Sequence, residues 1–496
     1  MIKVLFFGTH PNQYNGYSKV VYELARNIAK KEDIDLTVYG FQYFNKKELP
    51  GHRTDTTKYK IYDAQKGEGD DAKTMGFGIN EIAAQVSEIQ PDICIIYNDM
   101  HIISNVLQQL IKCKSASASL TDMKIVAYVD QVYLNQKKDF IKNLNNHCDH
   151  VITFTDYWDK IIKEQGMNLS TTVIQHAFNP QEMYPIDKNI ARKYYNMNED
   201  DFIILNLNRN QPRKRWDTCL KAFAEIVSRY PESNIKLLVA TSMQGAWKLV
   251  EIYERELSKR NVSLEVGIKH LVVIDRPQQM SDFETNILYN VADIGINTCD
   301  GEGFGLCNFE QAGLGIPQIV PKLGGFTDFF DNTRAEMVEP KMSFYVDSSR
   351  DSVAGEALLT DYVDYVESIE KLYNDPELRK SYATKSREYI IQNYKWNVMS
   401  EKLYDMIYSV TGKTKPIAAP AEPEQPTAET TAPPAEPEQP TADTTAPPAE
   451  PEPVAEATTS EVKKKSKKTK KKKKTPEQKE IEILKQQIAM LMAKSS

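Results

Sequence analysis

Two carboxylates, Glu302 and Glu310, flank a glycine-containing segment in the second half of the chain. Between them, Gly303 and Gly305 would let a ligand approach the main chain closely. We expect this segment to open a helix, because free N–H groups and the dipole at a helix start favour an anion such as phosphate. Glu310 would then lie about two turns inside, where its carboxylate can accept two hydrogen bonds from a vicinal diol such as ribose. The segment therefore predicts a nucleotide-sugar site.

A second charged group follows the predicted strand 201–208. It contains Arg209 and Lys214, with Arg213 and Arg215 beside them. Ligands of parallel sheets bind at the carboxyl ends of the strands, so these cations should face the ligand. Fixed cations there stabilise a departing diphosphate more strongly in the transition state than in the ground state. The alternative interpretation is a basic surface loop.

The carboxylate pair also resembles a known family. Glu302 and Glu310 match the E-x7-E signature of the retaining glycosyltransferases of family 4, which have the GT-B fold. The embedded Gly-Phe-Gly-Leu at 303–306 and the trailing Gly-Ile-Pro at 315–317 make this resemblance specific. It covers most of residues 1 to about 410. It implies transfer of a sugar from a UDP- or GDP-sugar to an acceptor, with retention at the anomeric carbon.

The resemblance also implies roles for individual residues. Arg209 and Lys214 would hold the diphosphate. Glu302 would contact the hydroxyls of the transferred sugar, and Glu310 would bind the ribose diol. Retention is usually explained by front-face attack, in which the leaving phosphate takes the acceptor proton, so no protein nucleophile is assigned.

Further donor contacts follow from the same resemblance. The main-chain amides of the donor loop would hold phosphate and sugar. Gly16, in the loop after the first strand, would let the first domain approach the donor phosphate, although an ordinary turn also explains it. Arg276 follows a strand of the second half, near the expected position of the base. The loop residues are Gly303, Phe304, Gly305 and Leu306.

The chain departs from the family at Asp130. Many members have a histidine after the corresponding strand, where it reaches the transferred sugar. A carboxylate can accept hydrogen bonds from sugar hydroxyls or orient the acceptor. His101, after the preceding strand, is the alternative replacement, and Asn98 and Asp99 also face the expected acceptor site. A histidine at a strand end is more often structural.

Two other functions stay open at this level. A nucleotide-sugar epimerase of the same architecture would release an altered sugar without an acceptor. A non-catalytic scaffold with a working tail is favoured by Asp130 and disfavoured by the retained Glu302, Glu310, Arg209 and Lys214. No Asp-x-Asp pair is placed to bridge a metal to a diphosphate, so we expect no required cofactor. Glycan, lipid, protein and small-molecule acceptors are all compatible with the sequence.

Strand and helix patterns alternate in both halves of the chain, which predicts an α/β fold with two Rossmann-like, doubly wound domains facing a cleft. Six scattered cysteines without a CxxC pattern indicate a reducing, cytoplasmic location. The predicted divisions are an acceptor domain at 1–175, a linker at 176–200, a donor domain at 201–392, a crossing helix at 393–410, a Pro/Ala/Glu/Thr repeat at 411–462, a lysine-rich run at 463–475 and a short amphipathic helix at 476–496.

The tail is built differently from the rest. The repeat cannot bury a core and predicts an extended, disordered spacer. Residues 463–474 contain ten lysines in twelve positions. This run suits an anionic membrane surface, an acidic partner or nucleic acid, and the absence of interleaved aromatics argues against base stacking. We favour a tether to a peripheral membrane surface or to a partner helix.

Overall fold

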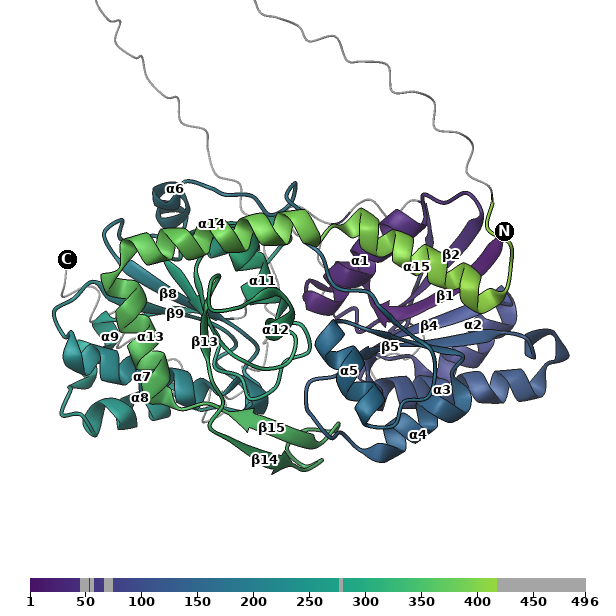
Figure 1. The fold of residues 1–496 in the computed structure, drawn as a ribbon, viewed down its shortest axis with the longest axis horizontal. Helices are drawn as coiled ribbons and strands as arrows, with labels where there is room; N and C mark the ends of the chain where they lie inside the picture. Colours follow the sequence, from purple (N-terminus) through teal and green to yellow (C-terminus); the bar gives the residue numbers. More distant parts are fainter. Residues whose placement is uncertain (45–52, 54–57, 67–74, 276–279, 417–496) are drawn as a thin grey trace, which may run out of the picture. The chain divides into compact units, whose positions relative to one another are not determined.

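The computed structural model describes residues 1–44, 53, 58–66, 75–275 and 280–416, and its first unit, Met1–Thr414, contains two parallel sheets covered by helices (Figure 1). We name the regions built on these sheets the N-terminal lobe and the C-terminal lobe. The prediction of two Rossmann-like α/β domains is confirmed. Both sheets are parallel with both faces covered, which explains why their strands are nearly continuous apolar runs.

The N-terminal lobe has a seven-stranded sheet in the order β3-β2-β1-β4-β5-β6-β7. Its first strands put polar residues at their carboxyl ends, where Asp99 closes β4 and Asp130 closes β5 as register partners. The strands are β1 Ile2–Thr9, β2 Ile34–Phe41, β3 Lys60–Asp63, β4 Ile93–Asp99, β5 Lys124–Asp130, β6 His150–Thr153 and β7 Thr171–Val173. The helices are α1 Gly16–Ile28, α2 Ile82–Ile89, α3 Met100–Ala116, α4 Lys138–His147 and α5 Asp156–Glu164.

The C-terminal lobe has a six-stranded sheet in the order β10-β9-β8-β11-β12-β13. Its central strand β8 leads directly into the basic loop, and β11 leads into the donor loop. The strands are β8 Phe202–Leu207, β9 Ile235–Ala240, β10 Leu271–Ile274, β11 Ile294–Ile296, β12 Gln318–Pro321 and β13 Glu336–Val338. The helices are α6 Lys188–Tyr194, α7 Trp216–Arg229, α8 Leu249–Ser258, α9 Leu264–Lys269, α10 Asp282–Asn290, α11 Leu306–Gly313, α12 Phe326–Phe329, α13 Tyr362–Asn374 and α14 Pro376–Asn393.

β6 ends at Thr153 because Thr155 caps helix α5, and the Thr155 hydroxyl accepts a hydrogen bond from the Trp158 amide at 3.1 Å. A threonine side chain that satisfies a free N–H group at a helix start is typical of an N-cap.

A hairpin that the sequence analysis missed joins the two lobes. Its strands, β14 Met342–Val346 and β15 Gly355–Leu359, are antiparallel and separate from both main sheets. β15 makes a bridge from Glu356 to Leu134, and hydrophobic residues of the hairpin pack on Val132 and Tyr133. The loop after β5, which follows Asp130, is therefore held from the C-terminal lobe as well as from its own sheet.

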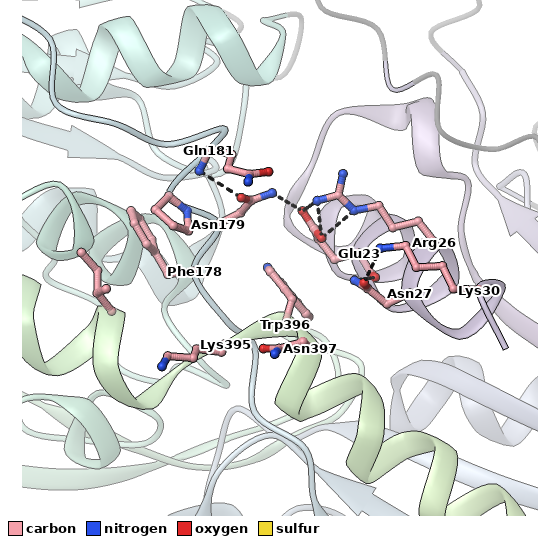
Figure 2. Close-up of a pocket in the computed structure, with 12 residues that line it drawn as sticks. Glu23, Arg26, Asn27, Lys30, Phe178, Asn179, Gln181, Lys395, Trp396 and Asn397 are labelled. Carbon is pink, nitrogen blue, oxygen red and sulfur yellow. Dashed lines mark hydrogen bonds and ion pairs between the residues drawn. The ribbon is translucent and has the colours of Figure 1, made fainter. Parts of the chain in front are cut away.

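The last helix, α15 Trp396–Thr411, returns to the N-terminal lobe and lies beside α1 (Figure 1). Tyr404 and Tyr408 on α15 both donate hydrogen bonds to the Asp33 carboxylate. At the crossing, the Phe178 amide donates to the Tyr394 carbonyl at 3.0 Å. A pocket of about 540 Å³ lies there, between α1, the chain at 178–181 and the start of α15 (Figure 2). No helix among the described residues is long and apolar enough to cross a membrane.

Candidate active site between the lobes

The donor loop reaches helix α11 through a left-handed turn. Gly305 precedes the helix with φ of 89°, a conformation that favours glycine. A Cβ atom there would also lie 2.2 Å from the Phe326 ring. Because α11 begins at Leu306, Glu310 is its fifth residue and lies little more than one turn inside. The expected depth of two turns was wrong, since the residues from Glu302 to Gly305 are not helical.

Lys214 and Glu302 form a buried ion pair at the base of this loop. Lys214 is the last residue of a short 3₁₀ turn after β8, and its ammonium contacts the Glu302 carboxylate. Arg213 lies 3.4 Å from the same oxygen and donates to the Gly301 carbonyl at 3.1 Å. Burial alone would raise the pKa of Glu302, but the Lys214 and Arg213 cations outweigh it and hold the pKa below its usual value. Glu302 is therefore ionised and charge-compensated.

Arg209 differs from these two cations. Its side chain is exposed, and within the described part of the chain its guanidinium has no hydrogen-bond or ion-pair partner. Its charge nevertheless acts on Glu302 and on Asp99 across the lobes. Arg209 therefore forms no ion pair with any described residue, and its guanidinium can bind an anionic ligand.

Glu310 is already engaged on both oxygens. Tyr289 of α10 donates to Oε2 at 2.9 Å, and Lys19 of α1 contacts Oε1 at 2.6 Å. The predicted diol acceptor therefore carries an ion pair from the opposite lobe. A ribose hydroxyl that donates to Oε1 would share this oxygen with the ammonium.

Three further residues were expected to contact the donor, namely Gly16, Phe304 and Arg276. Gly16 is the first residue of α1, after the N-cap Asn15, and a Cβ there would meet only Leu306 Cδ2 at 3.5 Å. The Phe304 side chain is buried against the His176 ring at a centroid distance of 4.6 Å, which leaves the loop main chain rather than the ring to face a ligand. Arg276 lies outside the described residues.

On the N-terminal side, Asp130 belongs to a cluster of two carboxyl groups and a phenol. The Tyr17 hydroxyl donates a short hydrogen bond to Asp130 Oδ2 and lies 3.1 Å from Asp99 Oδ1. One phenol proton cannot serve both carboxylates at full strength. Burial, followed by repulsion from Asp99, raises the pKa of Asp130 to about 7. Burial also raises the pKa of Asp99.

The second oxygen of Asp130 points at the donor loop. Oδ1 is buried and has no hydrogen-bond partner among the residues that the structure describes, and a Cβ on Gly303 would lie 1.9 Å from it. The loop is fixed in this position by Trp158, whose indole donates to the Gly303 carbonyl at 2.8 Å. Such an unpaired buried oxygen is costly unless a ligand supplies a donor. His101, the alternative to Asp130, is the second residue of α3 and takes no part in this cluster.

The structure therefore brings Arg209, Lys214 and Glu302 to one place, and it sets Gly16 and Asp130 against the same loop from the other lobe. Sequence reasoning missed three polar side chains in this region, Tyr17, Lys19 and Tyr289. A signal existed for one of them, because Lys19 lies in the apolar stripe of α1, where a buried charge must be paired. In the described residues, no group of three or more His, Cys, Asp or Glu side chains could hold a metal ion.

A family model described as "Family 4 Glycosyltransferase in conflict systems" matches residues 165–403. Residues 165–403 are therefore similar to glycosyltransferase family 4. The matched range contains Arg209, Lys214, Glu302 and Glu310, and it leaves Asp130 to the unmatched N-terminal lobe. The family 4 resemblance given by the sequence motifs is confirmed.

Curated relatives of the chain are glycosyltransferases that match part of it. D-inositol 3-phosphate glycosyltransferase 2 of Catenulispora acidiphila is 30% identical over 146 residues, which are 28% of this chain and 32% of that protein. A GDP-mannose-dependent monoacylated alpha-(1-6)-phosphatidylinositol monomannoside mannosyltransferase of Corynebacterium glutamicum is 22% identical over 226 residues, 45% of this chain and 52% of that protein. The chain thus spans about a third to a half of the length of these relatives.

Solved structures show that the protein has the GT-B fold. Sucrose-phosphate synthase from Thermosynechococcus elongatus aligns with a TM-score of 0.62 at 14% identity, covering 83% of this chain and 100% of that one. The Anabaena protein HepE, in complex with UDP-glucose, aligns with a TM-score of 0.57 at 12% identity, covering 82% and 100%. At these identities the likeness concerns the fold, which here includes both lobes.

Proposed function

We propose that this protein transfers a sugar from a nucleoside-diphosphate sugar to a hydroxyl acceptor with retention of anomeric configuration. The observation that carries the proposal is the convergence of Lys214, Arg213 and Glu302 beneath the donor loop, with Arg209 beside them. A basic surface loop would spread these cations in solvent, whereas Lys214 here is buried. The family match covers the same residues.

The C-terminal lobe holds the donor in this proposal. Arg209 and Lys214 bind the diphosphate, and main-chain amides of the donor loop and the start of α11 add neutral donors. As the bond from the anomeric carbon to the phosphate oxygen breaks, negative charge grows on the diphosphate. Two fixed cations stabilise that charge without solvent reorganisation. Glu302, held ionised by Lys214, accepts hydrogen bonds from hydroxyls of the transferred sugar.

The N-terminal lobe presents the acceptor. The unpaired Oδ1 of Asp130, directed at the donor loop, accepts a hydrogen bond from a hydroxyl of the acceptor or of the sugar. The acceptor oxygen forms the new bond to the anomeric carbon on the face that the diphosphate leaves. Its proton passes to the departing phosphate oxygen, so every bond and proton is accounted for without a protein nucleophile.

The donor in this proposal is a UDP- or GDP-sugar. HepE was solved with UDP-glucose, and the C. glutamicum relative is named for GDP-mannose and a phosphatidylinositol acceptor. These names support a nucleotide-sugar donor, and the second supports a lipid acceptor. Glycan and protein acceptors stay compatible with the sequence. Thermal-shift titration with UDP-, GDP- and ADP-sugars tests the donor, because a ligand of the native state raises its apparent stability.

The decisive experiment incubates the stabilising donor alone and then with candidate acceptors, and follows both nucleotide release and the sugar product. Slow donor hydrolysis that accelerates with an acceptor, and an α-configured product from an α-configured donor, is the expected result. Release of an epimerised sugar without acceptor would identify an epimerase instead. If the protein neither binds nor hydrolyses any donor, it is a non-catalytic scaffold.

Residues 417–496 lie outside the described residues, and their role is proposed from sequence alone. The lysine run would tether the enzyme to an anionic membrane surface or to a partner through the terminal amphipathic segment. Truncation after Thr411 should abolish binding to vesicles containing phosphatidylserine and leave donor hydrolysis unchanged. Equal vesicle binding by full-length and truncated protein would refute the tether.

A further inference from the structure

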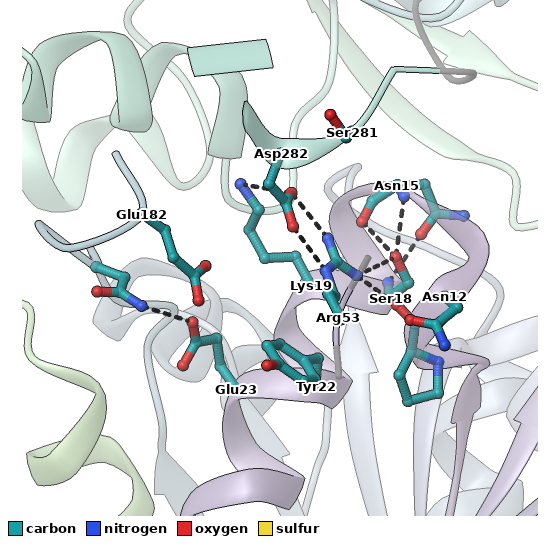
Figure 3. Close-up of polar contacts among 12 residues, drawn as sticks. Asn12, Asn15, Ser18, Lys19, Tyr22, Glu23, Arg53, Glu182, Ser281 and Asp282 are labelled. Atoms are coloured by element: carbon teal, nitrogen blue, oxygen red, sulfur yellow. Dashed lines mark hydrogen bonds and ion pairs between the residues drawn. The ribbon is translucent and has the colours of Figure 1, made fainter. Parts of the chain in front are cut away.

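Lys19 is a buried cation of the N-terminal lobe that lies between two carboxylates of the C-terminal lobe. Its ammonium is 2.6 Å from Glu310 Oε1 and 3.4 Å from Asp282 Oδ1. The Lys19 residue is only 9% exposed. Figure 3 shows the Lys19 side chain extending from α1 toward Asp282 at the start of α10. The contact joins the lobes at the carboxylate expected to bind ribose.

Asp282 is prepared to hold a second cation. Arg53 binds it in a bidentate manner, with Nε 2.7 Å from Oδ2 and Nη2 2.9 Å from Oδ1 (Figure 3). Arg53 is itself held by the Ser18 hydroxyl at 2.9 Å. Burial opposes ionisation of Asp282, but Arg53 and Lys19 outweigh it and hold its pKa well below the usual value. Asp282 therefore stays anionic and can accept a closer contact from Lys19.

Glu310 has one oxygen fixed and one exchangeable. Tyr289, on the same lobe, holds Oε2 at 2.9 Å. Among the described residues, Oε1 is held only by Lys19, which belongs to the other lobe. A carboxylate oxygen has two lone pairs, so a ribose hydroxyl that donates to Oε1 competes with the ammonium where both approach from the same side.

We propose that Lys19 changes its partner when a nucleotide binds. Its ammonium contacts the ribose-binding oxygen of Glu310 in the free enzyme and moves to the Asp282 carboxylate in the nucleotide complex. This inference rests on the proposed function, because it takes Glu310 as the ribose acceptor. The exchange needs only a small movement, since Lys19 already lies near both carboxylates. It also keeps the ammonium paired, so no buried cation is left without a partner.

The exchange predicts that Lys19 weakens nucleotide binding. Part of the affinity is used to break the Lys19–Glu310 contact, as in any protein whose free state competes with the ligand. A residue that simply bound the diphosphate would have the opposite effect. The sign of the change on removing Lys19 therefore separates the two roles.

The test compares the full-length protein with Lys19→Met in calorimetric titrations with UDP and GDP. We expect the better-bound nucleotide to bind Lys19→Met roughly tenfold more tightly, a change of about 1.4 kcal/mol. Unchanged or weaker binding would overturn the inference. Lys31→Met is the matched control, because it removes another lysine near α1 that pairs with Glu401 of α15, away from the donor loop. Thermal melting of both variants checks their folding.

Asp282→Asn provides a second, independent test of the exchange. Without this carboxylate the displaced Lys19 has no partner, so nucleotide binding should weaken several-fold, and Lys19→Met in the same chain should abolish that loss. Additive effects of the two substitutions would contradict the exchange. The double-mutant cycle remains informative where Asp282→Asn lowers stability through Arg53.

Glu310→Gln distinguishes failure of this inference from failure of the proposed function. No binding of UDP or GDP by the unmodified protein would overturn both. Binding that Glu310→Gln weakens but Lys19→Met leaves unchanged would overturn only the exchange. Binding insensitive to Glu310→Gln would overturn the ribose role and, with it, the exchange.

Discussion

The two sides of the site treat their carboxylates in opposite ways. On the donor side, Glu302 contacts the Lys214 ammonium and lies near Arg213, and these cations hold its pKa down. On the acceptor side, Asp130 has a phenol for a partner and a second carboxyl nearby, and its pKa rises to about 7. One side is an arrangement of paired charges with a spare cation, Arg209. The other is a buried acid with an unpaired oxygen.

This difference matches the chemistry proposed for each side. A departing diphosphate needs permanent positive charge, which paired and spare cations supply at every physiological pH. An incoming hydroxyl needs an acceptor of hydrogen bonds, which Asp130 supplies in its ionised form. The donor side should therefore respond to charge removal and the acceptor side to pH, and the following experiments test that contrast.

The largest effect should come from Lys214→Ala. Removing the buried ammonium takes away charge that stabilises the departing diphosphate, and fixed electrostatic groups of this kind contribute about 10²–10³ in turnover. We expect donor hydrolysis and transfer to fall by about that factor, measured as kcat, with a smaller change in KM. Lys322→Ala removes an exposed lysine paired with Glu339 and should change neither. Near-normal turnover of Lys214→Ala would show that this cation does not stabilise the departing diphosphate.

Asp130→Asn should lower transfer by about tenfold to 10²-fold, because a hydrogen bond to a charged group contributes about 1.5–3 kcal/mol. It should also stabilise the fold at high pH. In the unfolded chain this carboxyl loses its proton near 3.8, whereas in the folded protein it does so at about 7. Folding therefore loses free energy as the pH rises between those values, and the loss is complete above about 7.

Thermal melting checks the stability part of this prediction. The melting temperature of Asp130→Asn should exceed that of the unmodified protein at pH 8 and approach it as the pH falls below 3.8, where Asp130 is protonated in both states. A lower melting temperature at pH 8 would show that the ionised carboxylate has a stabilising partner.

The acidic limb of the activity profile should move in opposite directions in two variants. Asp99 repels charge on Asp130 and raises its pKa, so Asp99→Asn should shift the limb to lower pH. The Tyr17 hydroxyl stabilises the charged form, so Tyr17→Phe should shift it to higher pH. The groups Arg213 and Glu302 also face Asp130, and Arg209, Arg213 and Asp351 act on Asp99, so they are kept unchanged. Shifts of the same sign would show that the cluster does not set this limb.

The smallest effect is expected for Gly16→Ala. A methyl group fits at this position in the unliganded protein, since its nearest neighbour would be Leu306 at 3.5 Å. A donor phosphate beside the start of α1 would lose that space, so KM for the donor should rise by roughly tenfold or less, an effect on the order of 1 kcal/mol. The melting temperature should stay the same. An unchanged KM would show that the donor phosphate does not bind beside Gly16.

Much of the fold could be predicted from the sequence because parallel strands have a strong local signal. The apolar runs that became β1, β4, β5 and β8 are buried on both faces, so their composition alone revealed them. The hairpin of β14 and β15 escaped notice because Met342 and Tyr345 are exposed and its strands lack a buried apolar run. Its pairing with Leu134 is a long-range contact that no local pattern carries.

The functional site, too, could be predicted where its residues are close in sequence and not where they are distant. Spacing along one stretch of chain determined the donor loop, since Glu302, Gly305 and Glu310 lie within a few residues and the turn between them needs glycine. Only the tertiary structure decided that Lys19 occupies Glu310, that Tyr17 bridges Asp99 and Asp130, and that Asp130 points at Gly303. These contacts join residues from different lobes or strands, and their energies depend on burial and charge at a distance, which appear only when the chain has folded.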